Sequence, residues 1–405
     1  MRIALLPVLA LLASATWTPD LVAQGDGQGP VVHAPGIDSL ELGGQLRFRW
    51  EDRDHIPPVK NAPSDHMNLG RGRVHLKATV DEVWDAFVQF QESIGGLGSP
   101  SADTVHQLYG RYAGFDELVL QAGRFEMLYG NQRMISPLDW SNTGRAWDGV
   151  RVQFGRDEWS LDGFFTQPVL GQGATNADTD FAGLYGSWQG EPVQIDLYAL
   201  RRRDPVAAIE DMTIGGLVEG DLADNLTFDV ELAVQSGDHG VLDAGGTALA
   251  AGIDWTFEGG ATVGLGYELA SGDDNPGDGN DDTFLPLFNF DHYYQGHQDI
   301  VVWRNVQDII IRGSLPVDEG WKLIGAIHLL SRAEGTDALY TGMGGRGAVA
   351  KGTDEAIGTE VDVSLKGKLT DQVALWTGVS QFLAGDGIRN GEDQLWLFVQ
   401  IVFNF

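Results

Sequence analysis

Apolar and polar residues alternate along most of the chain, and this period of two constrains the fold more than any other feature. The same alternation occurs in residues 40–50, 70–78, 226–235 and 359–366. A helix would instead place apolar residues three and four positions apart. These segments therefore predict β-strands with one apolar and one polar face. In the third segment the apolar positions are Leu226, Phe228, Val230, Leu232 and Val234.

The spacing of such segments predicts about eighteen strands, with about sixteen as the fallback count. Every second connection is a tight turn, whereas the others include the long segments 51–68, 126–144, 273–305 and 333–355. Short turns on one side and long loops on the other are typical of an outer-membrane barrel. We therefore expect an all-β fold, a transmembrane outer-membrane β-barrel of antiparallel strands over residues 38–405. The expected strands are 38–50, 69–80, 83–91, 105–113, 118–125, 145–155, 158–167, 180–190, 192–203, 211–221, 225–236, 246–258, 260–272, 306–316, 320–332, 356–368, 371–384 and 393–405.

A soluble sandwich or a propeller would also contain alternating strands. A sandwich does not predict a regular succession of short and long connections, nor strands of about 10–13 residues throughout. No repeat of blade length is visible, which argues against a propeller. The membrane barrel is the favoured interpretation.

Both ends of the chain carry features of an exported protein. An apolar stretch begins after Arg2 and small residues end at Ala23, so we expect a signal peptide over residues 1–23 and a short periplasmic segment over 24–37. The last strand ends on Phe405 with an apolar face that would favour aggregation in a soluble protein. We expect the barrel-assembly machinery to bind this end, and the mature chain to lie in the bacterial outer membrane, in contact with lipid and lipopolysaccharide.

The composition narrows the functional classes. The chain has no Cys, which excludes thiolate metal sites, iron–sulfur clusters and cysteine nucleophiles. With 26 basic and 58 acidic residues the formal net charge is −32, which argues against a nucleic-acid partner, because such proteins neutralise phosphates with Lys and Arg. We expect no cofactor.

Basic residues lie on the polar faces of the predicted strands, whereas acidic residues crowd the connections. A charge that faces lipid at mid-depth costs about 2–4 kcal/mol, so most of these arginines are expected to face the lumen, where they favour anions. The alternative is that they pair with acidic residues across the interior and only stabilise the wall. The arginines expected along the solute path are Arg47, Arg49, Arg71, Arg73, Arg124, Arg151 and Arg312.

A run of aspartates in one long connection is a weak candidate for a Ca²⁺ site, because closely spaced carboxylates suit a hard cation. The spacing matches no EF-hand, and a solvated loop is the favoured interpretation. The run consists of Asp273, Asp274, Asp278, Asp281 and Asp282.

Two segments, LQAGRFEMLYGNQR (120–133) and LDWSNTGRAWDGVR (138–151), resemble the signature of the alginate export family. Residues 283–296 and 357–362 are similar to later blocks of that family. The resemblance implies a monomeric outer-membrane channel of eighteen strands whose arginine-rich lumen carries an anionic polysaccharide outward. The arginines that it places on the path are Arg124, Arg133, Arg145 and Arg151.

The connection 126–144 holds three further candidates, Asp139, Trp140 and Asn142. In wide barrels such a loop can fold inward and narrow the pore, so we expect a constriction here. The structural alternative is that Trp140 only packs and that Asp139 pairs with Arg145.

These observations predict a channel for anionic solutes, with export of an alginate-like polysaccharide as the leading function. The alternative is a general anion-preferring diffusion or uptake porin without a polymer substrate. An enzyme is not expected, since the motifs do not assemble a set of Ser, His and Asp; His328 would be the residue to mutate in a test for turnover.

Overall fold

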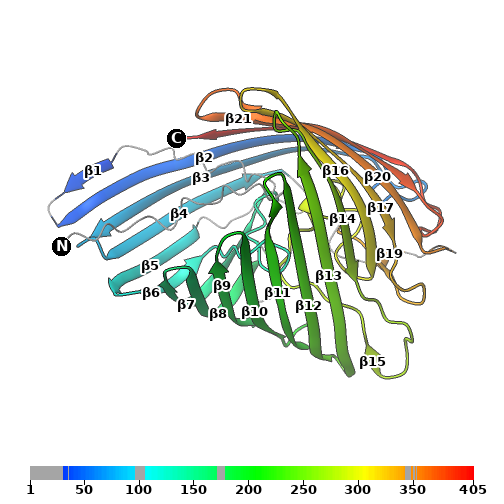
Figure 1. Ribbon diagram of the computed structural model, residues 1–405, viewed down its shortest axis with the longest axis horizontal. Helices are drawn as coiled ribbons and strands as arrows, with labels where there is room; N and C mark the ends of the chain where they lie inside the picture. The colour runs from blue at the N-terminus through cyan, green and yellow to red at the C-terminus, as the bar shows by residue number, and fades with distance from the viewer. Residues whose placement is uncertain are drawn as a thin grey trace.

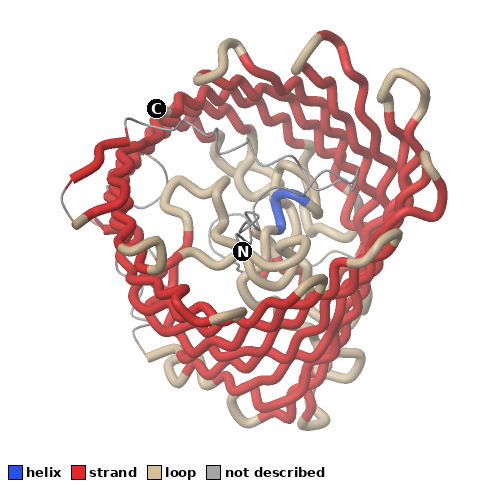
Figure 2. Tube along the Cα trace, turned by 60° about the vertical axis from the view of Figure 1, so that its left-hand side comes forward, coloured by secondary structure: helices blue, strands red, loops and turns tan. Residues whose placement is uncertain are grey.

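The computed structural model describes residues 31–34, 36–95, 105–170, 178–342, 348–349, 352 and 354–405. Eighteen antiparallel strands form a closed barrel, as the alternation predicts, and the first of them pairs with the last (Figures 1 and 2). The strands are β2 (Ile37–Arg53), β3 (Asp65–Val80), β4 (Trp84–Ile94), β5 (Val105–Phe115), β6 (Leu118–Phe125), β7 (Arg145–Arg156), β8 (Trp159–Leu170), β9 (Asp180–Gln189), β10 (Val193–Asp204), β11 (Ile209–Ala223), β12 (Leu226–His239), β13 (Leu242–Thr256), β14 (Thr262–Ala270), β16 (Val306–Asp318), β17 (Trp321–Ser331), β20 (Ala356–Lys368), β21 (Val373–Ala384) and β22 (Gln394–Asn404).

The described residues form four further short strands outside this succession: β1 (Val31–Ala34), β15 (Asn280–Asp281), β18 (Leu339–Tyr340) and β19 (Ala348–Val349). β1 pairs antiparallel with β2, so the end of the expected periplasmic segment adds a strand to the sheet. The expected signal peptide lies outside the described residues.

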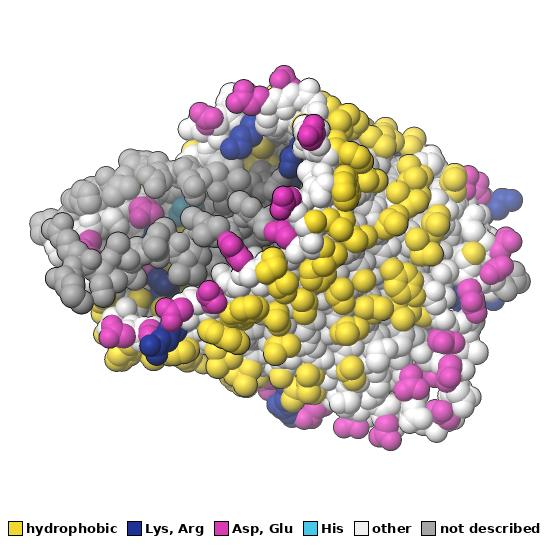
Figure 3. Space-filling model, viewed as in Figure 1, with side chains coloured by type: hydrophobic (Ala, Val, Ile, Leu, Met, Phe, Trp, Pro, Cys, Tyr) yellow, Lys and Arg dark blue, Asp and Glu magenta, His cyan; other side chains and the backbone are white. Residues whose placement is uncertain are grey.

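The outer face of the barrel is apolar. Leu184, Leu197 and Ile214 come from the adjacent strands β9, β10 and β11, and each exposes more than half of its side chain. Apolar side chains cover the side of the barrel seen in Figure 3, while acidic and basic side chains gather toward its edges. A water-soluble protein rarely exposes so large an apolar surface. Among the described residues no helix has the length and apolar character needed to cross a bilayer.

The connections on one side of the barrel are tight turns. Between β3 and β4, Asp81 and Glu82 both have positive φ, 51° and 57°, which matches the twist of a short hairpin. On the other side, several connections are shorter than expected, among them the one between β12 and β13. The expected connection 237–245 is only Gly240-Val241, because β12 and β13 pair as far as His239 and Leu242. The added residues at the ends of β12 and β13 are mostly glycine or polar residues. They were not expected in strands because backbone pairing beyond the apolar band does not require apolar side chains.

Two of the long connections fold into the barrel (Figure 2). We name residues 126–144 the constriction loop and residues 271–305, which contain the short helix η1 (Asp291–Tyr293), the inner loop. They pair with each other, since Ser136 N donates to Phe288 O at 2.9 Å and Phe288 N donates to Met134 O at 3.0 Å. Buried apolar side chains from both loops and from the wall form the main hydrophobic cluster. The interior is therefore a packed assembly of loops against the barrel wall.

Candidate functional site: the arginine wall and the constriction loop

Four arginines on two paired strands face the interior. Arg47 and Arg49 come from β2, and Arg71 and Arg73 from β3. Side chains two residues apart in a strand share a face, so each strand contributes two neighbouring guanidinium groups. None exposes more than 6 % of its surface. We name this set the arginine wall.

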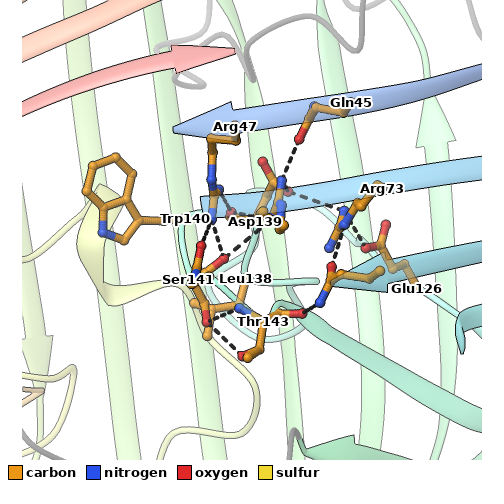
Figure 4. Close-up of polar contacts among 12 residues, drawn as sticks. Gln45, Arg47, Arg73, Glu126, Leu138, Asp139, Trp140, Ser141 and Thr143 are labelled. Atoms are coloured by element: carbon orange, nitrogen blue, oxygen red, sulfur yellow. Dashed lines mark hydrogen bonds and ion pairs between the residues drawn. The ribbon is translucent and has the colours of Figure 1, made fainter. Parts of the chain in front are cut away.

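The arginine wall holds the tip of the constriction loop through the loop's backbone carbonyls (Figure 4). Arg47 donates to Asp139 O and, at 2.8 Å, to Ser141 O. Arg71 donates to Asp139 O at 3.0 Å, and Arg49 donates to Trp140 O at 2.7 Å. Three consecutive carbonyls are thus turned toward guanidinium groups, which fixes the position of the tip inside the barrel.

Two side chains of the same loop complete the attachment. Asp139 Oδ1 lies 2.7 Å from Arg71 Nη2 and 3.5 Å from Arg73 Nη1. Asn142 accepts from Arg47 at 3.4 Å and donates to the carbonyls of Gly70 and Ile94 at 3.2 and 3.1 Å. The alternative pairing of Asp139 with Arg145 is therefore wrong, because the loop turns this carboxylate toward β3.

The charges at the arginine wall do not balance. Besides Asp139, the carboxylates in contact are Glu51, 2.6 Å from Arg49, and Glu126, 3.2 Å from Arg73. In the part of the chain that the structure describes, these four guanidinium groups thus contact three carboxylates. Burial alone would raise the pKa of Asp139, but Arg71, Arg73 and Arg47 together hold this pKa well below its usual value. Within these contacts the excess charge is positive.

Arg133 belongs to the constriction loop, and its side chain reaches the side of the barrel opposite the arginine wall. It lies 3.2 Å from Glu268, 3.5 Å from Asp229 and 3.8 Å from Glu231, and its guanidinium stacks 4.0 Å above the ring of Tyr294. Arg312 on β16 contacts Asp254 at 2.5 Å and shares Asp229 at 3.5 Å. We name Asp229, Glu231, Asp254 and Glu268 the acidic wall. Arg133 and Arg312 therefore form ion pairs with acidic residues of the interior. For these two arginines the structure shows the pairing that the sequence analysis gave as the alternative.

Two more predicted arginines face inward without joining the arginine wall. Arg145 donates to the carbonyls of Ser136 at 3.1 Å and Phe288 at 2.5 Å, so it binds the two inner segments together. Arg151 donates to Gln121 at 2.6 Å and lies 5.3 Å from the ring centre of Phe125.

The family model for alginate export matches residues 38–397, nearly the whole chain. The chain belongs to the alginate export family. No curated protein matches the chain significantly. The family and the fold are those of outer-membrane channels.

Solved outer-membrane porins share the fold of this family member. OccK11 (OpdR) of Pseudomonas aeruginosa superposes with a TM-score of 0.65 at 11% identity, over 90% of this chain and 96% of that one. OccAB3 of Acinetobacter baumannii gives 0.63 at 12% identity, over 90% and 99%. OprD of Pseudomonas aeruginosa gives 0.61 at 13% identity, over 90% and 94%. At these identities the likeness concerns the fold alone.

One residue in the family-like segments lies on the wrong face for the path. Arg124 shares the face of Leu120 and pairs across the sheet with Leu108, whose side chain is 56% exposed. Its guanidinium makes a two-pronged ion pair with Asp148, at 2.7 and 2.9 Å. The prediction that Arg124 lines the lumen is therefore wrong. Arg124 lies near the end of β6. At this position an arginine on the outer face can lie beyond the apolar band and form an ion pair with Asp148.

The aspartate run is only partly brought together. Carboxylate oxygens of Asp273, Asp274 and Asp282 lie within 4.8 Å of one another. Asp281 instead lies 2.8 Å from His239, and Asp278 accepts from the side chain of Asn275 at 3.2 Å. The five residues therefore do not form one ligand set.

An aromatic cluster beside the arginine wall was not predicted. Trp376, Trp396 and Phe398 point inward from β21 and β22 and pack against Trp140 of the constriction loop. The sequence did hold a signal for it. In the last strand Trp396 and Phe398 lie between Gln394 and Gln400, on the face opposite the apolar positions Leu395, Leu397 and Val399. Large aromatics on a lumenal face need a partner inside the barrel.

Proposed function

We propose that this protein is an anion-preferring channel of the outer membrane and that it exports an anionic polysaccharide. One observation carries the proposal: four guanidinium groups of two neighbouring strands converge on the tip of a loop inside the barrel, where they outnumber the carboxylates that they contact. Arginine binds carboxylates through parallel hydrogen bonds, and lumenal arginines favour anions. Membership of the alginate export family supports the polymer as the solute class.

A general diffusion porin is the second candidate, and the packing of the interior argues against it. The constriction loop and the inner loop are joined by backbone hydrogen bonds and share a hydrophobic cluster with the wall. Such packing suits a selective path, because a solute must displace or pass structured segments. A general anion-preferring porin would share the dependence of the current on the arginine wall, but deleting its gene would leave the periplasmic polysaccharide unchanged.

The experiment is a reversal-potential measurement in planar bilayers under a salt gradient. We expect the wild type to prefer anions and the variant Arg47→Gln/Arg71→Gln to lose much of that preference. Arg124→Gln is the matched control, because this arginine lies on the outer face beside Asp148 and should leave the reversal potential unchanged. A wild type that prefers cations, or a double variant that behaves like the wild type, contradicts the proposal. Export of a polymer is tested by deleting the gene and measuring polysaccharide in the periplasm, where it should accumulate.

A further inference from the structure

The side chain of Trp140 lies in a cage of aromatic rings inside the barrel. Its ring stacks on His292 at 4.1 Å with an interplanar angle of 14°. Trp376, Phe398 and Trp396 meet it edge to face at 5.1, 5.5 and 6.0 Å. We name these four residues the aromatic cage. The guanidinium of Arg49 lies 3.7 Å from the centre of the same indole, so a cation also covers it.

The aromatic cage has polar groups that the indole of Trp140 does not use. Trp376 Nε1 and His292 Nε2 are buried and have no hydrogen-bond partner among the residues that the structure describes. These side chains are only 7% and 3% exposed, so bulk water does not satisfy them readily. A buried polar group without a partner costs free energy, and native structures contain few of them. An indole in the cage supplies ring contacts but leaves these two nitrogens unused.

The missing contacts indicate the kind of ligand that would fit. Flat aromatic rings take the apolar face of a ring-shaped ligand, and unpartnered nitrogens take its hydroxyl groups. A pyranose ring has both features: axial C–H groups on a face and hydroxyls around its edge. A purely apolar ligand would leave the two nitrogens unpaired.

We propose that the aromatic cage is a binding subsite for a pyranose ring of the conducted polysaccharide, and that Trp140 fills it as a tethered occupant in the resting channel. The proposal rests on the proposed function for the origin of the sugar. The aromatic cage is a second binding site beside the arginine wall, and the tip of the constriction loop blocks it in the resting channel.

The position of Trp140 couples this site to the constriction. Its neighbours Asp139 and Ser141 are held by the arginine wall through their carbonyls, so the same short segment occupies both sites. A ligand shifts a conformational equilibrium only by the difference in its affinity for the two states. A polymer of acidic sugars binds better when the tip is displaced, since its rings and carboxylates then take the places of Trp140 and Asp139.

The test uses a neutral hexasaccharide of glucose as the probe and single-channel recording of the full-length protein. Removing the tethered occupant removes the cost of displacing it. We expect Trp140→Ala to show a larger conductance step and blocking events that last about tenfold longer in the presence of the probe. Adding Trp376→Ala to this variant should shorten the events again. Trp159→Ala is the matched control, because this indole is 64% exposed at the first residue of β8, beside the tight turn that follows β7.

Two outcomes overturn the proposal: Trp140→Ala is blocked no longer than the wild type, or the blocks are as long in Trp140→Ala/Trp376→Ala as in Trp140→Ala. If Trp140→Ala does not fold, as judged by the heat-dependent gel mobility of the barrel, Trp140→Phe serves instead. Its smaller ring should give blocks of intermediate length, and blocks of wild-type length would also overturn the proposal. Because the probe is neutral, its binding does not depend on anion preference, and the reversal potential tests the proposed function separately.

Discussion

Arg71 and Asp139 join the barrel wall to the constriction loop through an ion pair of 2.7 Å. The arginine side chain is fully buried, whereas the aspartate keeps 39% of its side chain exposed. The pair is thus formed at the border between the wall and the space beside the loop. Arg71 supplies positive charge and favours anions, whereas Asp139 cancels part of that charge.

Asp139→Asn should increase the preference for anions. The substitution keeps the size of the side chain and its contact with Arg71 but removes one of the three carboxylates that the arginine wall contacts. The reversal potential under a salt gradient should move further in the anion-selective direction than that of the wild type. A shift toward cations would show that Asp139 does not offset the arginine wall.

The effect of the Asp139 charge on ion selectivity should persist in mild acid. Burial would raise its pKa, but Arg71, Arg73 and Arg47 lower it well below the ordinary value of about 3.9. For an acid with a depressed pKa in the folded state, the stabilisation is present above the ordinary value and is lost only as the pH falls through the depressed one. The difference in reversal potential between the wild type and Asp139→Asn should therefore be the same at pH 7 and pH 5. Its disappearance at pH 5 would mean that Asp139 takes up a proton there.

Arg133→Ala should destabilise the barrel strongly. Arg133 is 4% exposed and is the shared partner of Asp229, Glu231 and Glu268. Asp229 also contacts Arg312, so the loss of Arg133 leaves chiefly the buried Glu231 and Glu268 without the cation that neutralises them. Removing one member of a buried ion pair costs about 3–5 kcal/mol. The free energy of unfolding can be measured by urea titration in lipid vesicles.

Arg201→Ala is the control for this experiment. Arg201 pairs with Glu210 at 2.5 Å, but both side chains are about half exposed. Solvent screens such a pair, and the expected loss is below about 1 kcal/mol. Equal losses for the two variants would contradict the view that Arg133 neutralises the acidic wall.

Gly44→Val should impair closure of the barrel. Gly44 and Phe405 exchange backbone hydrogen bonds of 2.8 and 3.0 Å at the seam. A Cβ atom at position 44 would lie 2.6 Å from the carbonyl oxygen of Arg73 and would also meet the Phe405 ring, so a side chain cannot enter without moving the backbone. We expect less heat-modifiable barrel in the outer-membrane fraction.

Gly72→Ala provides the comparison for the seam variant. The nearest atom to a Cβ there is Leu46 Cδ2 at 3.5 Å, an ordinary contact on the neighbouring strand. Normal assembly of Gly72→Ala together with failure of Gly44→Val would locate the defect at the seam. Normal assembly of both variants would show that the seam tolerates a side chain.

The sequence by itself determined the barrel and its strands. Alternation is a local property: each residue's face follows from its neighbours two positions away, and a bilayer outside the barrel requires one face to be apolar. The turn at Asp81-Glu82 and the inward direction of Arg47, Arg49, Arg71 and Arg73 follow from that rule. Arg124 shows its limit, since an arginine near a strand end can lie on the outer face when Asp148 pairs with it.

Only the tertiary structure decided how the interior is filled. Asp139 pairs with Arg71 across 68 residues of sequence, and Trp140 meets His292 across a larger separation. No local periodicity encodes such contacts, because they depend on the path that two long loops take inside a closed wall. The sequence supplied the charged and aromatic side chains, and the closure of the barrel around those loops set which of them meet.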